Sequence, residues 1–226
     1  YRLHNLEYIK QHPEEIPCII GKPQVLFERT WKNPVLLGAG IYSHPVDCPY
    51  LFVKYPNVKR ILVPGPWIKD MFEPFYPGKV SAWPVGIDTD TWSDQIKGEP
   101  AIDFLIYDKI LWDKEKTRAE LIAPICQVLD KCSLSYKFIQ YGNYLPNDLH
   151  EKVKCVRSVI FLCEHETQGI AYQQILATGT PVLAWSQSKY WLDPGYYPEI
   201  KFGPVSSVPY WDDRCGIKFT GVEEFE

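Results

Sequence analysis

Short apolar runs alternate with amphipathic stretches through the second half of the chain. The runs are rich in β-branched and aromatic residues and are bounded by polar or glycine-containing turns, a pattern typical of buried strands. They lie at residues 102–107, 136–141, 158–162, 181–185 and 215–219. Because helical segments separate most of these runs, the order predicts an α/β domain with a parallel sheet. Its neighbouring strands should carry Phe104, Ile139, Ile160 and Val182.

The segments between the strands have apolar residues at helical spacing. The longest covers 116–132, and its apolar stripe consists of Leu121, Ile122, Ile125, Val128, Leu129 and Cys132. Pro124 predicts a kink or a late start there, because proline removes a helical hydrogen bond. A second helix is predicted at 146–156. A third should begin at Glu166 and Thr167, which can cap free N–H groups, and should end at Gly179.

The first half of the chain is less regular. Strands are predicted at 16–20, 24–27, 35–40, 60–63 and 79–83, and a helix at 67–72 after Pro66, which suits the first helical turn. The polar stretch 93–100 is typical of a linker. The sequence therefore predicts two α/β domains, a short one at 1–92 and a second at 93–226.

The predicted strand–loop–helix–strand segment at residues 158–185 could bind a ligand. The first turn of its helix presents unpaired N–H groups and a partial positive charge, which suit a phosphate group. Gly169 permits close backbone approach, and Glu166 can accept hydrogen bonds from hydroxyl groups. A phosphate beside a polyhydroxy group predicts a nucleotide sugar. An ordinary βαβ unit with a polar loop would show the same spacing.

These residues resemble the donor-binding segment of retaining glycosyltransferases with the two-domain GT-B fold. That family has Glu, Gly, an aromatic residue and Gly, a second Glu eight positions after the first, and then Ala-x-Ala-x-Gly-x-Pro-Val. Glu166, Gly169 and the tail at 177–182 match this pattern. Three positions differ, namely Thr167, Gln168 and Gln174. The second Glu of the family holds the nucleotide ribose, and Gln174 keeps an acceptor there without the charge.

Two further stretches resemble the same family. Pro84-Val85-Gly86-Ile87-Asp88 is similar to the Pro-Asn-Gly-Ile/Val-Asp segment between the two domains of the family. The family also has Gly-Arg, with a Lys five positions after the Arg, facing the diphosphate. Here Lys109 and Lys114 have that spacing, and the Gly is absent. Such a cation pair would offset charge on the leaving diphosphate. A pair of solvated lysines is the alternative.

The resemblance implies two Rossmann-like domains facing a cleft, in a compact or truncated variant. It implies transfer of a sugar from a nucleotide diphosphate sugar to a glycan or other hydroxyl acceptor, with retention and without a metal or other cofactor. Glu166, Lys109 and Lys114 would be catalytic. The donor-binding residues would be Thr167, Gln168, Gly169, Ile170 and Gln174, with Tyr141 and Gly142 near the base.

An acceptor-side group is predicted at the end of the 35–40 strand. Ligands of α/β sheets bind at the carboxyl ends of strands, and the small-residue turn of Gly38 and Gly40 leads to His44. A partly buried loop histidine is the alternative.

The aromatic, proline-rich stretch 190–211 is either an acceptor-sugar platform or a packed loop. The first domain is short, and Gln174 replaces the second Glu of the family pattern. The chain could therefore also be a non-catalytic GT-B relative that binds a glycan, a nucleotide or a protein. A sugar-nucleotide epimerase has the same fold and is a further alternative.

Composition narrows these alternatives. The chain has 226 residues, 46% of them hydrophobic, and a net charge of −4 without a basic run, so a nucleic-acid partner has little support. No apolar stretch approaches the roughly 20 residues of a membrane helix. Seven cysteines without a Cys-x-x-Cys pair predict reduced thiols and a cytoplasmic location. No metal site is predicted. The chain begins at Tyr1, and no signal peptide is visible, so we expect its natural N-terminus to be missing.

Overall fold

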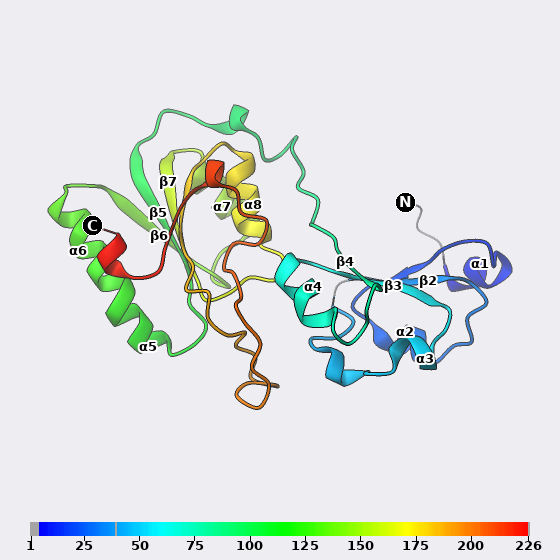
Figure 1. The fold of residues 1–226 in the computed structure, drawn as a ribbon. Helices are drawn as coiled ribbons and strands as arrows, with labels where there is room; N and C mark the ends of the chain where they lie inside the picture. The colour runs from blue at the N-terminus through cyan, green and yellow to red at the C-terminus, as the bar shows by residue number, and fades with distance from the viewer. Residues whose placement is uncertain (1–4, 39, 226) are drawn as a thin grey trace. The chain divides into compact units, whose positions relative to one another are not determined.

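The computed structural model describes residues 5–38 and 40–225. The chain divides after Pro84 into a first unit and a second unit, which begins at Val85. Each contains one parallel sheet (Figure 1). The α/β class with two Rossmann-like sheets, expected from the sequence, is therefore confirmed.

The first unit contains a four-stranded sheet in the order β1-β2-β3-β4, with every neighbouring pair parallel. Its strands are β1 (Cys18–Ile19), β2 (Val35–Leu37), β3 (Val58–Val63) and β4 (Val80–Ala82). Its helices are α1 (Leu6–Gln11), α2 (Pro23–Phe27), α3 (Leu51–Lys54), α4 (Pro66–Phe72) and the 3-10 turn η1 (Pro45–Asp47). Core residues include Leu37, Ile61 and Phe72, each at most 2% exposed.

One predicted strand of the first unit is wrong. Residues 24–27 belong to helix α2, whose first turn begins with Pro23 and which buries Leu26. The fixed φ angle of proline suits the first turn of a helix, and this outweighs the strand preference of Val25 and Phe27. The strand predicted at 16–20 exists only as the two residues of β1.

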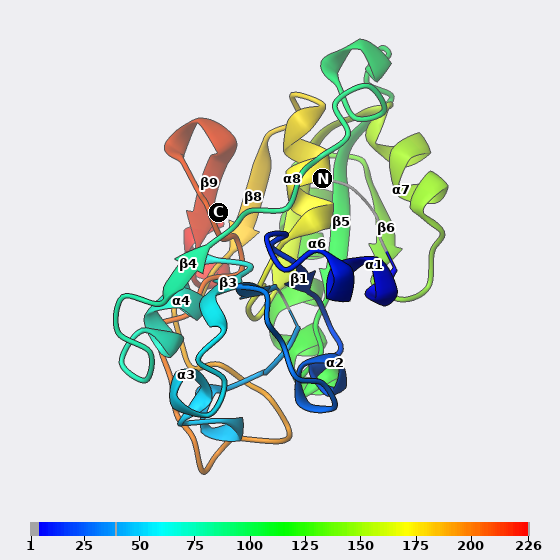
Figure 2. The same ribbon diagram turned by 90° about the vertical axis from the view of Figure 1, so that its right-hand side faces the viewer.

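The second unit contains a five-stranded sheet in the order β6-β5-β7-β8-β9, again parallel throughout. Figure 2 shows β9 and β8 toward one side of this sheet and β5 and β6 toward the other. Its strands are β5 (Ile102–Lys109), β6 (Tyr136–Gln140), β7 (Val156–Cys163), β8 (Val182–Trp185) and β9 (Gly216–Phe219). The parallel sheet predicted from the apolar runs is confirmed, with Phe104, Ile139, Ile160 and Val182 on neighbouring strands.

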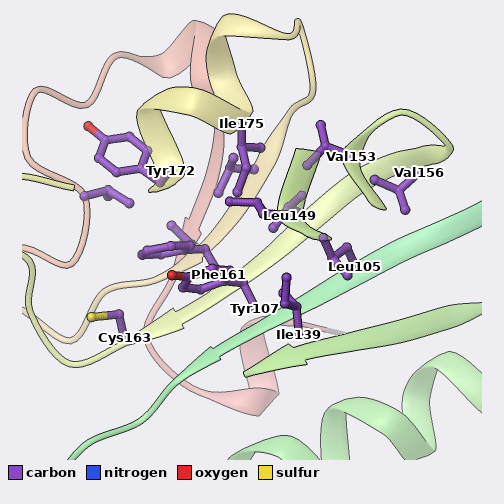
Figure 3. Close-up of a cluster of buried hydrophobic side chains, with 14 of the residues drawn as sticks. Leu105, Tyr107, Ile139, Leu149, Val153, Val156, Phe161, Cys163, Tyr172 and Ile175 are labelled. Carbon is purple, nitrogen blue, oxygen red and sulfur yellow. The ribbon is translucent and has the colours of Figure 1, made fainter. Parts of the chain in front are cut away.

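Helices cover both faces of this sheet, as a buried parallel sheet requires. On one face Leu105, Tyr107 and Phe161 pack against α7 (Pro146–Val153) and α8 (Ile170–Ala177) (Figure 3). On the other face Ile106 and Ile160 pack against α6 (Ala123–Lys131). The remaining short elements are α5 (Lys114–Thr117), a π-helical turn at Arg118–Ile122, and the 3-10 turns Asp94–Ile96, Asp213–Cys215 and Val222–Glu224.

Pro124 interrupts the helix predicted at 116–132. It lies in the first turn of α6, and the turn before it, Arg118–Ile122, is π-helical. The missing N–H and the bulk of the ring prevent a regular hydrogen bond from Pro124 to the preceding turn. The predicted irregularity at Pro124 is therefore confirmed.

The segment that follows Pro84 packs against the second unit and forms hydrogen bonds with it. Trp92 is 6% exposed and belongs to the core beneath α7. The Lys97 ammonium donates to the carbonyl oxygens of Val153 (2.7 Å) and Val156 (2.6 Å) and to the Thr180 hydroxyl (3.0 Å). The predicted domain boundary at residue 92 thus falls inside the second unit. Within the described ranges, no helix combines the length and apolar character needed to cross a membrane.

Candidate functional site at the carboxyl edge of the second sheet

An ion pair lies where two neighbouring strands end. Strand β5 extends two residues beyond its predicted end, so that Lys109 is its last residue and lies beside Cys163 of β7. The Lys109 Nζ is 2.5 Å from Oε2 of Glu166, which follows β7, and each side chain is 13% exposed. The structure thus brings together two residues that are 57 positions apart in sequence and that were both predicted to be catalytic.

The surroundings of Lys109 keep it charged. Burial alone would lower the pKa of Lys109, but the Glu166 carboxylate and its hydrogen bond more than offset burial and raise the pKa. The Lys109 ammonium also lies 4.3 Å from the centre of the Tyr141 ring, a cation–π distance. Tyr141 directly follows β6 and is 49% exposed. The edge therefore holds a fixed cation between a carboxylate and an accessible aromatic ring.

Helix α8 begins later than predicted. Glu166 and Thr167 were expected at its entrance, but the helix starts at Ile170, and Gly169 precedes it with φ of +70°. A Cβ at Gly169 would lie 2.4 Å from the Tyr172 ring, so only glycine fits. Among the described residues, no protein acceptor takes the backbone N–H of Gln168, Gly169 or Ile170. These donors are the ones predicted to hold a phosphate.

Replacing Gly169 with alanine should destabilise the second unit by about 2–5 kcal/mol, from left-handed strain and the overlap with Tyr172. Gly179 is a matched control, because it has φ of +71° and a Cβ there would meet only Asp94 at 3.7 Å. Gly179→Ala should cost only about 1–2 kcal/mol. Urea denaturation of both variants measures the difference, and equal losses would show that the Tyr172 ring does not close this position.

Two carboxylates that the sequence analysis missed fix the loop after β5. Glu164 accepts hydrogen bonds from the N–H groups of Leu111 (3.0 Å) and Trp112 (2.9 Å). Asp108 accepts the Ile110 N–H at 3.0 Å through one oxygen and the Arg118 guanidinium at 2.7 and 3.0 Å through the other. Both carboxylates lie at the carboxyl ends of predicted strands, which was the available signal. They hold the loop between Lys109 and Lys114.

Buried hydroxyl and thiol groups lie below the ion pair. The Tyr107 and Tyr144 hydroxyls are 2.8 Å apart. Burial, followed by the hydrogen bond with Tyr144, raises the pKa of Tyr107. Burial and then the Glu166 charge raise the pKa of the Cys163 thiol, which is fully buried and donates to the His165 carbonyl oxygen at 3.1 Å. The raised pKa values keep Tyr107 and Cys163 neutral beside the charged Lys109–Glu166 pair.

His165 connects the Glu166 segment to the long loop at 186–212 through a hydrogen bond. Its Nε2 accepts the Leu192 N–H at 3.0 Å and lies 2.9 Å from the Leu192 carbonyl oxygen. On the other side, the Glu166 N–H donates to the Ser206 carbonyl oxygen at 2.9 Å. Glu166 is therefore held at its backbone as well as through Lys109.

The stability of the second unit should fall as the pH drops below about 6.5, which is the ordinary pKa of a histidine side chain. Burial lowers the pKa of His165, and the hydrogen bond with the Leu192 backbone and the nearby Glu164 and Glu166 oppose this shift only in part. Below 6.5 the unfolded chain takes up the proton more readily than the folded chain, and the loss continues until the pH is below the folded pKa. Denaturation of His165→Asn between pH 5 and 8 should show a weaker pH dependence than the wild type. An unchanged dependence would assign the loss to titratable groups other than His165.

The other predicted site residues lie in three places, at the start of α5, just after β6, and on or just before α8. Lys114 is exposed and begins α5, and Gly142, with φ of +83°, follows Tyr141. The Thr167 N–H donates to Glu166 Oε1 at 3.2 Å. Gln174 lies half-buried on α8. Within the part of the chain that the structure describes, no three His, Cys, Asp or Glu side chains gather as a metal site would require.

The predicted acceptor-side residues belong to the first unit. His44 is 5% exposed, and its Nδ1 accepts the Val46 N–H at 3.1 Å, which caps the turn η1. Gly38 follows β2, where a Cβ would meet Ile20 at 2.7 Å, and Gly40 has φ of +75°. Both glycines line a cavity of about 20 Å³, room for about one water molecule. Their acceptor role stays a prediction.

Comparison with known proteins shows similarity in fold. No family model and no curated protein sequence matches the chain. A crystal structure of accessory secretory protein 1, 2 and 3 in Streptococcus pneumoniae is 15% identical, covers 97% of this chain and 46% of that one, and has a TM-score of 0.54. A crystal structure of the GtfA/B complex is 13% identical, covers 74% of this chain and 42% of that one, and has a TM-score of 0.48. The chain thus spans less than half the length of each. At this identity, the first likeness shows a shared fold alone.

Proposed function

We propose that the chain transfers a sugar from a nucleotide diphosphate sugar to a hydroxyl group of a glycan or other acceptor. The observation that carries the proposal is the Lys109–Glu166 pair beside the open N–H groups that precede α8. A cation, backbone donors and a carboxylate at one edge match a diphosphate joined to a polyhydroxy ring. Two findings support the proposal, namely the two Rossmann-like sheets and the sequence resemblance to retaining GT-B enzymes. The proposal includes the two-domain GT-B arrangement and a cytoplasmic location.

The donor would lie along the carboxyl edge of the second sheet. The N–H groups of Gln168, Gly169 and Ile170 would hold the phosphates together with Lys109. The Glu166 carboxylate, fixed through its backbone and through Lys109, would accept hydrogen bonds from the sugar hydroxyls. Gln174 would meet the ribose. The base would lie at Tyr141 and Gly142, where the exposed ring offers a stacking surface.

Transfer with retention needs no protein nucleophile. The acceptor oxygen forms a bond to the anomeric carbon as the bond from that carbon to the diphosphate breaks, and the acceptor proton passes to the leaving diphosphate oxygen on the same face. Negative charge on the diphosphate grows as this bond breaks. Lys109 is fixed before the reaction and kept protonated, so it would stabilise that charge without reorganising. The mechanism requires no metal or cofactor.

A second candidate is a non-catalytic module that binds a glycan, a nucleotide or a protein. Two contacts favour it: Glu166 already neutralises Lys109, and Glu164 already occupies the N–H groups of Leu111 and Trp112. An incoming diphosphate must share or displace these carboxylates. The fold shared with accessory secretory protein 1, 2 and 3 is compatible with this candidate.

A panel of nucleotide sugars separates the two candidates. Thermal-shift measurements with UDP-, GDP- and ADP-sugars should show one base that stabilises the protein, since ligand at about 100 times its Kd adds roughly 2.7 kcal/mol. The same donor should then release its nucleoside diphosphate in the presence of acceptors. Stabilisation without release supports the non-catalytic module, and no stabilisation by any nucleotide sugar excludes the proposed transferase.

A further inference from the structure

A cavity of about 450 Å³ lies in the first unit, away from the predicted acceptor-side residues. Helix α1 contributes one part of its lining, and the segment at 28–33, which leads into β2, contributes the other. Its volume falls within the range of small-molecule sites, about 300–1,000 Å³. The cavity beside Gly38 and Gly40, by contrast, holds about one water molecule.

This larger cavity lies at the amino edge of the first sheet. Asn33, which lines it, comes two residues before β2 begins at Val35, whereas Gly38 follows the other end of β2. All four strands of the sheet run parallel. Ligands of α/β sheets usually bind at the carboxyl ends of the strands. A ligand at the amino edge would therefore occupy a second site, separate from the predicted acceptor position.

Hydrogen bonds fix the walls of the cavity. The Asn33 side chain is 3% exposed, and its amide nitrogen lies 2.8–3.3 Å from three carbonyl oxygens of α1 and the turn after it, those of Ile9, His12 and Glu15. The indole N–H of Trp31 donates to the carbonyl oxygen of Leu26, a core residue of α2, at 3.3 Å. Both walls are thus held before a ligand arrives, as is usual for small-molecule sites.

Positive charge gathers at this cavity, although the chain as a whole has a net charge of −4. The described part of the lining contains three cations, Lys10, Arg29 and Lys32, and one carboxylate, Glu28. Lys10 pairs with Glu7 at 2.6 Å, and the pKa of Glu7 is lowered mainly by Lys10 and least by Arg29. Within the described residues, the exposed side chains of Arg29 and Lys32 make no hydrogen bond or ion pair. These two cations can therefore accept an anionic partner.

Apolar side chains line the same cavity. Leu6 and Ile9 come from α1, Trp31 comes from the segment at 28–33, and all three are half-buried. The indole ring offers a flat surface on which another ring can stack. The lining thus combines an aromatic surface with two cations on the same segment, Arg29 and Lys32.

We propose that this cavity binds a small organic anion that carries an aromatic ring, with the negative charge supplied by a carboxylate or a phosphate group. The ring would pack on Trp31, and the anionic group would take hydrogen bonds from the Arg29 guanidinium and the Lys32 ammonium. The inference is independent of the proposed transferase, because every residue that carries it belongs to the first unit.

Titration of phenyl phosphate into the full chain, followed by heteronuclear NMR, tests the site. The reporter is the indole N–H signal of Trp31, which is assigned by its disappearance in Trp31→Phe. Phenyl phosphate and benzoate should shift this signal with a Kd on the order of 1 mM, the scale expected for so small a ligand. Benzyl alcohol lacks the charge and inorganic phosphate lacks the ring, so each should bind at least about fivefold more weakly.

The double variant Arg29→Gln/Lys32→Gln removes both cations and should weaken the binding of phenyl phosphate about tenfold. Both side chains are exposed, so the remaining signals of the spectrum should stay in place. Lys22→Gln is the matched control, because Lys22 is also exposed in the first unit and lies outside the described lining. Lys109→Met should leave the shift of Trp31 unchanged, because Lys109 belongs to the second unit.

Four results would overturn the site. Phenyl phosphate could leave the Trp31 signal in place, benzyl alcohol or inorganic phosphate could shift it equally, or Lys22→Gln could weaken binding as much as the double variant. A loss of the shift in Lys109→Met would assign the binding to the carboxyl edge of the second sheet. Failure of every nucleotide sugar to bind would contradict the transferase alone and would leave this site untouched.

Discussion

Replacing Glu166 with glutamine should lower the rate of sugar transfer at least about 10²-fold, the scale of losing one preorganised electrostatic group. Nucleoside diphosphate binding should stay the same or become tighter. The carboxylate is proposed to touch the sugar, whereas Lys109 and backbone N–H groups are proposed to hold the phosphates. With glutamine at 166, the Lys109 charge is no longer offset by a carboxylate 2.5 Å away, and it becomes available to the diphosphate.

Calorimetry with the nucleoside diphosphate and turnover assays with the nucleotide sugar measure the two effects. Glu151→Gln is the matched control, because Glu151 also pairs with a lysine, Lys154, at 2.6 Å, but is 55% exposed on the surface. Surface pairs contribute about 0–1 kcal/mol, so this control should change neither binding nor turnover. Equal loss of binding and turnover in Glu166→Gln would contradict the separation of sugar and phosphate contacts, and unchanged turnover would remove Glu166 from the mechanism.

The strands of the second unit could be predicted because their apolar runs are continuous. A strand buried on both faces must be apolar throughout, so Ile160 and Val182 mark β7 and β8 without further information. The start of α8 could not be predicted in the same way. Glu166 and Thr167 have the side chains of a helix cap, but the Tyr172 ring packs against the left-handed Gly169 and delays the helix to Ile170.

The candidate site could be predicted only in part, for a similar reason. Glu166 was found from its place before the predicted helix and Lys109 through the resemblance, but their contact depends on the register that places Lys109 beside Cys163. Glu164 was missed because its partners are backbone N–H groups of a loop, which have no sequence signature. The anchoring of the loop at 186–212 depends equally on backbone partners at Leu192 and Ser206.

The two lysines that the sequence treats alike are unlike in the structure. Lys109 is 13% exposed, paired with Glu166 and placed over Tyr141, whereas Lys114 is exposed at the start of α5. Lys109→Met keeps much of the stem and removes the charge. We expect its kcat to fall about 10²-fold with a smaller change in donor KM, because charge on the diphosphate is largest in the transition state.

Lys114→Met should change kcat and KM by less than about threefold, since a solvated charge at an exposed position contributes little. It is therefore the internal control for Lys109, with the same substitution in the same region of the fold. Removing one partner of a buried pair costs up to about 3–5 kcal/mol, so circular dichroism must first show that Lys109→Met is folded at the assay temperature.

The double variant Lys109→Met/Glu166→Gln separates stability from catalysis. Because it leaves neither a cation nor a carboxylate unpaired, it should recover most of the stability lost by Lys109→Met while remaining inactive. Steady-state kinetics on all three variants decide the role of Lys109. A raised donor KM at unchanged kcat would assign it to ground-state binding alone, and unchanged kinetics in both single lysine variants would rule out a diphosphate at this edge of the sheet.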